Sequence, residues 1–414
     1  MKSLKIILFS CLVLLFASCE SDDGGSGTAV FAVPVVKSLS AIRNSVSILT
    51  AVETDSQGKI YVTENNLFYI AKETGVHVFD NQNPASPQNI AFINIEGVHD
   101  IAIKDHYLYA DNYVDLLVFD IADINNITLV QTLQNAVSFY PAYPESAEYY
   151  DYSVDAGAGE IITGFRLENR ERPQYNSTDG DVLTAGEAQN DNGAVGTGGS
   201  FAKFQINKNA LYTVDSYQLN VFNITNPEAA FFDKAVYMEM WFGGGQLETL
   251  FKQKDYLFVG ATNGMQIVDA SDEFNPYFIS GFSHATACDP VVVNDNTAYI
   301  TVRGGTSCGA IEDQVNVIDV SDITNPTLVS TYLLGQPYGL GFENNILYVC
   351  CGTDGLKVFD ASNAAGLTLE NSYAGNVTDV IAMGSHLIAV GDNKIVQYSY
   401  GPDYTLVPIS ELNF

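Results

Sequence analysis

The stretch Gln314-Val315-Asn316-Val317-Ile318-Asp319 decides the fold, because its pattern of a short apolar strand ending in an aspartate recurs along the chain. Copies begin at residues 75, 115, 218, 264 and 355, of which the copy at residue 218 ends in Asn223 instead, and a last copy at residue 393 lacks the aspartate. The first six starts lie 40, 103, 46, 50 and 41 residues apart, so the interval of 103 residues holds one period plus a long insertion. A period of this size predicts a repeat protein.

Each copy is the third strand of a four-strand unit. Strand hairpins with polar turns precede it, clearest at 101–109, 204–212, 291–299 and 340–348, and a corner such as Asn325-Pro326 leads to a fourth strand. Four antiparallel strands in about 40–45 residues make a propeller blade, and seven such units favour closure around an axis. We therefore predict an all-β fold: a seven-bladed β-propeller of four-stranded antiparallel blades, spanning 29–414 with an insertion at about 135–200.

The aspartate at the end of the third strand has a structural interpretation. Its carboxylate is placed to accept hydrogen bonds from backbone N–H groups of the turn that follows. A site for catalysis or metal binding in every repeat is not needed to explain it.

The apolar-Val-apolar-Asp strand followed by Asn-Pro resembles the LVIVD repeat of bacterial and archaeal surface propellers. The resemblance covers roughly 58–412 apart from the insertion. It implies the propeller fold and a surface location, as in surface lipoproteins of the Bacteroidota type. It brings no catalytic residues to this chain.

Two segments compete for the outer strand of the last blade. Residues 404–411 would supply it from the carboxyl end, and residues 35–39 would supply it from the amino end. The sequence leaves both open.

The amino terminus has the pattern of a bacterial lipoprotein. Lys2 and Lys5 precede an apolar run that is too short to span a bilayer, which is typical of a signal peptide, here 1–18. Cys19 follows at the position of a lipidated cysteine, and the polar, acidic segment 19–28 predicts a disordered tether. We expect a lipid-anchored protein of the outer membrane that faces outward.

The charge balance excludes one class of partner. With 49 acidic and 18 basic residues, the formal net charge is −31. Such a chain repels nucleic acid and anionic membrane surfaces. Glycans and surface proteins remain as partners, and the sequence leaves the oligomeric state open.

Aromatic residues gather in loops that the propeller topology places on one face. The insertion opens with tyrosines interspersed with carboxylates, a composition that suits stacking on a sugar ring, and that also suits pinning a long loop to the rim. The only tryptophan precedes a phenylalanine and three glycines in a loop on the same face. The candidate aromatic residues are Tyr140, Tyr143, Tyr149, Tyr150, Tyr152, Trp241 and Phe242.

Polar residues precede the first strands, where they would line the mouth of the central channel. They could bind Ca²⁺ through oxygen ligands, position a water, or cap loops beside the channel. His/Cys spacing for zinc, a nucleophile elbow and a phosphate loop are all absent from the sequence. The candidates on this face are His99, Asp100, Lys203, Glu248, His284, Asp289 and Asp379.

Four cysteines remain beyond the signal peptide and Cys19. Cys288 and Cys308 fall on one face of one predicted blade, so we expect a disulfide between them. Cys350 and Cys351 are open to a free, vicinal or mixed pairing.

These features favour a binding or interaction module for a glycan or protein partner over an enzyme. The alternatives are a hydrolase or lyase that acts on polysaccharide through carboxylates at the channel mouth, and a purely structural scaffold. A hydrolase would need two convergent acids, one with a raised pKa.

Overall fold

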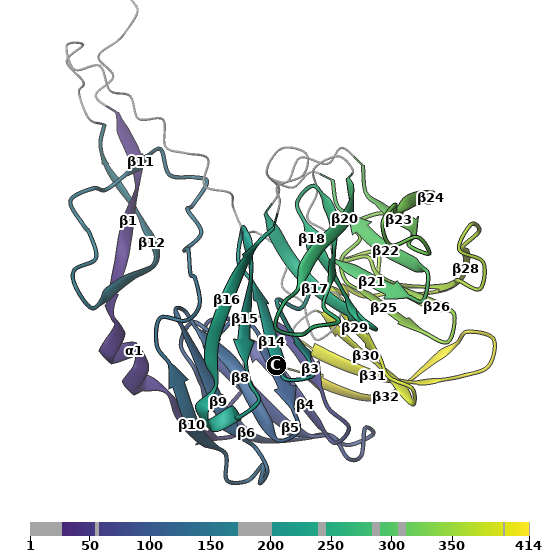
Figure 1. The fold of residues 1–414 in the computed structure, drawn as a ribbon, viewed down its shortest axis with the longest axis horizontal. Coiled ribbons are helices and arrows are strands. Elements are labelled where there is room, and N and C mark those ends of the chain that lie inside the picture. Colours follow the sequence, from purple (N-terminus) through teal and green to yellow (C-terminus); the bar gives the residue numbers. More distant parts are fainter. Residues whose placement is uncertain are drawn as a thin grey trace, which may run out of the picture.

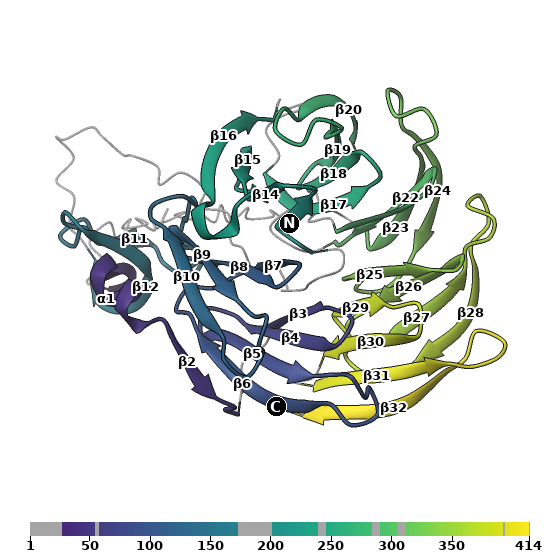
Figure 2. The same ribbon diagram turned by 60° about the horizontal axis from the view of Figure 1, so that its bottom comes forward.

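The computed structural model describes residues 27–53, 58–172, 201–238, 246–283, 290–304, 312–391 and 394–413. Within them the fold is all-β, with eight sheets and two short helical segments. Six sheets have four strands, one has five and one has three, which confirms the four-stranded antiparallel repeat unit. Figure 2 shows the repeat sheets following one another around a common centre.

In the first two repeat sheets all neighbouring strands are antiparallel, and a short loop joins one sheet to the next. The first sheet comprises β2 (Ser47–Thr50), β3 (Gly58–Val62), β4 (Asn66–Ala71), β5 (Gly75–Asp80) and β6 (Gln88–Asn94). The second comprises β7 (Ile101–Lys104), β8 (Tyr107–Asn112), β9 (Asp115–Asp120) and β10 (Thr128–Leu133).

The next three sheets follow after the insertion. The third is β13 (Phe204–Asn207), β14 (Ala210–Val214), β15 (Gln218–Asn223) and β16 (Phe231–Tyr237), with the turn η1 (Pro227–Ala229) before its last strand. The fourth is β17 (Leu247–Gln253), β18 (Tyr256–Ala261), β19 (Gly264–Asp269) and β20 (Tyr277–Ser283). The fifth is β21 (Val291–Asn294), β22 (Thr297–Val302), β23 (Gln314–Asp319) and β24 (Thr327–Leu333).

Two sheets complete the repeats. The sixth is β25 (Leu340–Glu343), β26 (Ile346–Cys350), β27 (Leu356–Asp360) and β28 (Thr368–Tyr373). The seventh is β29 (Asp379–Ala382), β30 (His386–Gly391), β31 (Lys394–Tyr400) and β32 (Leu406–Asn413).

The core lies between neighbouring sheets, which explains why the strands are apolar on both faces. Each apolar cluster joins residues of two adjacent sheets, and one cluster joins Tyr69 and Phe79 of the first sheet to Ile388 and Ile395 of the seventh. The tyrosine of the second strand is almost fully buried in five repeats, at Tyr69, Tyr109, Tyr212, Tyr299 and Tyr348.

The repeated aspartate has the structural role predicted for it. Asp319 Oδ1 accepts a hydrogen bond from Ser321 N at 2.8 Å, and the next acid, Asp322, accepts one from Thr324 N at 3.0 Å. Hydrogen bonds from the side chains of Ser321 and Thr324, together with those from these N–H groups, lower the pKa of both carboxyls. The same first bond forms at Asp80, Asp120, Asn223, Asp269 and Asp360.

The carboxyl end supplies the outer strand of the last sheet. β32 pairs antiparallel with β31, whereas the competing segment 35–39 lies elsewhere, mostly in the strand β1 (Thr28–Ser38). Between the first and seventh sheets, the buried amides of Asn81 and Gln397 exchange hydrogen bonds of 3.2 and 2.7 Å.

The three-stranded sheet, here called the side sheet, stands apart from the repeats (Figure 1). β1 lies at its centre, between β11 (Tyr149–Tyr150) and β12 (Glu160–Glu171), which both belong to the insertion. The helix α1 (Leu39–Ser45) then leads to the first repeat sheet. The insertion enters between the second and third sheets, as predicted, but it recruits the amino-terminal strand into a unit of its own.

Among the described residues, α1 has seven residues, and no helix has the length and apolar character needed to cross a membrane.

Candidate functional site

The loops that enter the first strands and the loops between second and third strands lie together, on what is here called the inserted face. Backbone hydrogen bonds link the two sets: Gly97 N donates to Glu73 O at 3.0 Å, and Tyr113 N donates to Gly97 O at 3.2 Å. The insertion continues this pattern, because Val137 N donates to Val114 O at 3.0 Å.

The side sheet is fixed to this face through α1. The Arg43 guanidinium donates two hydrogen bonds to the Asp115 carboxylate, at 2.7 and 2.8 Å, and Asp115 is almost completely buried. Asn135 joins the same cluster, since its N–H donates to Asp115 Oδ1 at 2.9 Å. A two-pronged arginine–carboxylate contact with a buried acid holds the helix in one orientation.

Tyr113 packs next to this contact, at a turn where its φ is +52°. Its ring contacts Phe139 edge-on at 4.7 Å between centroids, and it covers Gly97, where a Cβ atom would lie 2.4 Å from the ring. Gly97, with φ at +80°, is therefore required by both conformation and space.

The predicted insertion tyrosines divide between the two faces of the side sheet. Tyr143, Tyr150, Tyr152 and Phe165 form one group, here called the tyrosine cluster, with centroid distances of 4.7 to 6.4 Å. Tyr149 lies on the other face, stacked on Phe31 at 5.1 Å, with the Arg170 guanidinium 5.3 Å from the Phe31 ring.

Two of these tyrosines are mainly solvent-exposed. Tyr140 and Tyr152 keep 75% and 76% of their surface accessible, whereas Tyr143 and Tyr150 are partly covered, and burial raises the pKa of both phenols. Within the tyrosine cluster, Tyr143, Tyr150 and Phe165 thus form a packed base on which the Tyr152 ring is exposed.

At the channel mouth, the Asp100 carboxylate is occupied by hydrogen bonds from the protein backbone. Its carboxylate accepts hydrogen bonds from Ile101 N at 2.8 Å, Lys203 N at 2.5 Å and Phe204 N at 3.3 Å, and Lys59 Nζ lies 3.7 Å away. Burial raises the pKa of the carboxyl despite the nearby Lys59. These contacts tie the first, second and third sheets together.

Residues 201–203, at the end of the insertion, form what is here called the channel strap. Besides Lys203, Phe201 O accepts from Lys59 Nζ at 3.4 Å, and Ala202 O accepts from Leu250 N at 2.6 Å. The Phe201 ring lies within 3.0 Å of the point where a Cβ on Gly339 would stand. The strap therefore contacts the first, second, fourth and sixth sheets across the mouth of the channel. Sequence reasoning missed Lys59 and Phe201, because neither lies in a recognisable motif.

The other predicted polar residues have different surroundings. His99 Nδ1 lies 3.1 Å from Asp111 Oδ2, and its ring lies 5.7 Å from that of Phe139. Asp379 is completely buried beside Gly339, and both it and the half-buried Glu248 have interactions within the protein. Over the described ranges, no three His, Cys, Asp or Glu side chains gather in an arrangement suited to a metal ion.

Seven predicted residues lie outside the described ranges: Cys19, Trp241, Phe242, His284, Cys288, Asp289 and Cys308. The proposed Cys288–Cys308 disulfide therefore stays a prediction. Cys350 and Cys351 are buried free thiols in two different apolar clusters. Burial raises the pKa of Cys351 to about 12 and that of Cys350 as well.

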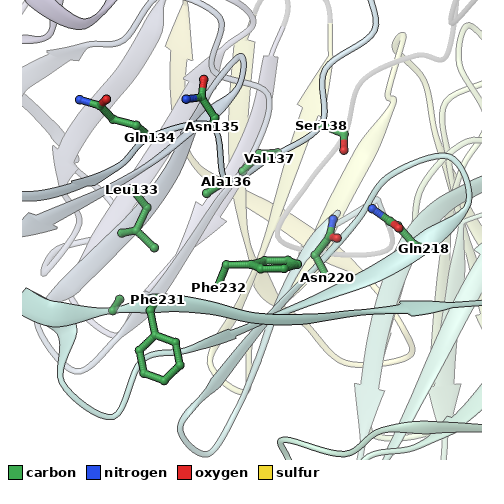
Figure 3. A pocket seen from close by; sticks show the side chains of 11 residues that line it. Leu133, Gln134, Asn135, Ala136, Val137, Ser138, Gln218, Asn220, Phe231 and Phe232 are labelled. Carbon is green, nitrogen blue, oxygen red and sulfur yellow. The ribbon is translucent and has the colours of Figure 1, made fainter.

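A groove of about 410 Å³ opens between the second and third sheets (Figure 3). The segment 133–138 forms one wall, and Gln218, Asn220, Ala230, Phe231 and Phe232 form the other. The Gln131 amide bridges the two sheets beneath it, with two hydrogen bonds of 2.8 Å to the backbone of Ala230. The sequence analysis did not single out the phenylalanines of this groove.

Comparison with known proteins identifies the repeats. The LVIVD repeat family matches residues 97–134, 253–282 and 287–333, so the chain contains LVIVD repeats as the strand pattern predicted. No curated protein matches the chain in sequence.

Several solved structures share the fold. A protein from Lactobacillus plantarum aligns with a TM-score of 0.56 at 12% identity, over 88% of this chain and 95% of that chain. The periplasmic gluconolactonase of Pseudomonas aeruginosa aligns with a TM-score of 0.54 at 9% identity, over 89% of this chain and 96% of that chain. The computationally designed protein Ika8 aligns with a TM-score of 0.51 at 12% identity, over 88% and 89% of the two chains. At these identities the likeness concerns the β-propeller fold and not the activity.

Proposed function

We propose that this LVIVD-repeat protein is a surface binding module that recognises a glycan or protein partner through its inserted face. The observation that carries the proposal is the insertion, which presents the exposed rings of Tyr140, in the loop before the side sheet, and Tyr152, just after β11. Exposed aromatic side chains on a rigid support are typical of recognition surfaces, because little entropy is lost when they bind.

The support for a rigid side sheet comes from its attachments. The Arg43–Asp115 contact joins it, through α1, to the second sheet, and the Tyr113–Phe139 contact joins the start of the insertion to that same sheet. A partner that binds the tyrosine cluster would therefore meet a preorganised surface.

The same proposal includes a ring of seven blades. The seven repeat sheets share one order of four consecutive strands, to which β2 is added in the first, and the first and last are joined by an apolar cluster and by the Asn81–Gln397 pair. In this arrangement the ring is closed by side-chain packing, with β32 completing the last blade.

We propose further that Cys19 is lipidated and anchors the chain at the outer membrane, facing outward. β1 begins at Thr28, nine residues after Cys19, at the end of the side sheet that lies away from α1. Nine extended residues span at most about 30 Å. The anchor would thus hold the side sheet close to the membrane, which favours partners that are themselves attached to the cell surface.

The alternative function, a polysaccharide hydrolase or lyase, has weaker support. A buried acid with a raised pKa, such as Asp100, suits a general acid. Its oxygens, however, already accept three backbone N–H groups, and the channel strap lies over them. These contacts are those of a structural carboxylate.

The proposal is tested with the chain from residue 20, which lacks the signal and Cys19. We expect saturable binding to a glycan on an array, or to a purified surface protein, that is weakened by the double substitution Tyr140→Ala and Tyr152→Ala. Tyr277→Ala is the matched control, because Tyr277 is 57% exposed but belongs to the fourth sheet. Equal binding by all three proteins would remove the side sheet from the site. Release of sugar from a polysaccharide, lost in Asp100→Asn, would favour the hydrolase instead.

A further inference from the structure

We infer that the groove between β10 and β16 is a binding site for a neutral saccharide. The inference deepens the proposed function, on which it rests, by giving the inserted face a second subsite with a defined ligand class. The groove and the tyrosine cluster flank the same insertion: residues 134–138 line the groove, and the tyrosines follow directly.

The lining of the groove contains no ionisable side chain. It combines two phenylalanines with four carboxamides, and its lining residues are Leu133, Gln134, Asn135, Ala136, Val137, Ser138, Gln218, Asn220, Ala230, Phe231 and Phe232. In a chain with a net charge of −31, an uncharged surface of this composition is distinctive. It favours a ligand that is uncharged and rich in hydroxyl groups, and its volume lies within the usual range for small-ligand sites.

The two carboxamides on β15 are held so that their oxygens are available. Gln218 Nε2 donates to Asp215 Oδ2 at 2.9 Å, and Asn220 Nδ2 lies 3.4 Å from Asp215 Oδ2 and 3.4 Å from Thr213 Oγ1. Asp215 Oδ2 accepts from both amide nitrogens, so the two amide oxygens face away from it as acceptors. Within the described ranges no protein group donates to these two oxygens. Asn220 is only 3% exposed, so its oxygen is a nearly buried acceptor that lines the groove.

Phe232 supplies a flat apolar platform beside these acceptors. Its ring packs edge-on against Phe222 with 5.5 Å between centroids, yet 43% of the residue is exposed. Figure 3 shows the Phe232 ring extending towards Asn220, while the Phe231 ring turns away from the groove. The C–H face of a sugar ring would pack on Phe232, and its hydroxyls would donate to the oxygens of Gln218 and Asn220.

The opposite wall has fewer groups to offer a peptide. Asn135 N binds Asp115, Asn135 Oδ1 accepts from Arg43 at 3.3 Å, and Val137 N binds Val114 O. A peptide strand would need free backbone donors on this wall, whereas a saccharide needs only acceptors and an apolar face. An acidic sugar would also find no cation among the lining residues.

The test is calorimetric titration of the chain from residue 20 with neutral tetrasaccharides (cellotetraose, mannotetraose and galactotetraose) and with tetragalacturonate as the acidic counterpart. We expect saturable binding of at least one neutral probe and none of the acidic one. Phe232→Ala and Gln218→Ala should each weaken the neutral probe about tenfold or more. Tyr277→Ala is the matched control, since it removes an exposed ring of the fourth sheet that does not line the groove, and it should leave the affinity within about twofold.

The outcomes separate this inference from the proposed function. Binding of no neutral tetrasaccharide, binding of the acidic probe with equal affinity, or equal affinity in Phe232→Ala and Tyr277→Ala would each overturn the saccharide groove. The Tyr140→Ala/Tyr152→Ala protein is titrated in parallel. If the groove variants bind the array or surface-protein partner normally while the tyrosine variant does not, the proposed function stands and only the groove fails. If the Phe232→Ala protein does not fold, Gln218→Ala, a surface substitution, still tests the groove.

Discussion

The pKa values of single residues in this protein depend on the surroundings of each side chain as well as on its type. His77 is a clear example, because it lies in a strand among the rings of Tyr69, Phe79 and Phe92, with centroids 4.6 to 6.5 Å away. Burial there lowers its pKa to about 4. Asp100 is the converse case, a carboxyl whose pKa is raised by burial and whose oxygens accept three N–H groups at the starts of β7 and β13.

The depressed pKa of His77 predicts a specific loss of stability in mild acid. Because its folded pKa lies below the ordinary value of 6.5, the unfolded chain takes up a proton first as the pH falls from about 6.5 to 4. The free energy of unfolding should therefore drop by about 1 to 2 kcal/mol from this group between pH 7 and pH 5. His77→Phe should remove that part of the pH dependence, as measured by urea unfolding at the two pH values. An unchanged difference between pH 7 and pH 5 in the variant would contradict the assignment.

The contacts of Asp100 predict that it holds the channel strap in place. Asp100→Ala removes the carboxylate that faces the buried Lys59 and accepts three backbone N–H groups, at a cost of about 3 kcal/mol. Trypsin should then cut after Lys203 faster than in the parent protein. Lys59→Met keeps the acceptor for the three N–H groups and should show a smaller effect. Equal cleavage rates in the Asp100→Ala and parent proteins would mean that the strap is held by other contacts.

At the level of elements, the repeat is specified by its turns. Asp319 and Asp322 each accept a backbone N–H two residues ahead, and this pair of turns leads the chain into β24. The third repeat uses Asn223 and Asn226 in the same two positions, so an amide oxygen can replace the carboxylate.

This equivalence predicts graded effects of substitution. Asp319→Asn keeps the acceptor and should lower Tm by about 1 °C or less, whereas Asp319→Ala removes it and should lower Tm by about 2–3 °C. The hydrogen bonds also lower the pKa of Asp319, so its contribution should be present above the ordinary carboxyl pKa and fade as the pH falls below it. Calorimetric scans at pH 7 and pH 3 check both statements, and equal Tm values for the Asn and Ala variants at pH 7 would refute the first.

The elements also show how much of the fold can be predicted from the sequence. Strand identity, the four-strand unit, the place of the insertion and the role of the aspartate all follow from local patterns that repeat. The pairing of β1 with β12 does not, because alternation identifies a strand but not its partner, and Val30 and Asn169 are far apart in the chain. The channel strap and the groove combine segments from several repeats, so no local pattern contains Phe201 beside Gly339 or Phe232 across the groove from Val137.

At the scale of the whole molecule, the two ends of the chain belong to different sheets and have different structural roles. β32 forms the outer edge of the seventh sheet, whereas β1 forms the centre of the side sheet. The seventh sheet packs against the first through Ile388, Ile395 and Leu412, so that β32 takes part in the joint between the ends of the repeat array. In a propeller, each sheet is stable only when both of its faces are covered.

Truncation at the two ends should therefore have opposite consequences. Removing 401–414 deletes β32 and uncovers part of the joint at Leu412, so we expect loss of a single cooperative unfolding transition and a tendency to aggregate. Removing 20–46 deletes β1 and α1 but no strand of a repeat sheet, so the main transition should persist while binding that depends on Tyr140 and Tyr152 is lost. Differential scanning calorimetry and light scattering on both truncated proteins provide the measurement. A cooperative, monomeric protein after the carboxyl-terminal truncation would show that the joint between the first and seventh sheets does not depend on β32.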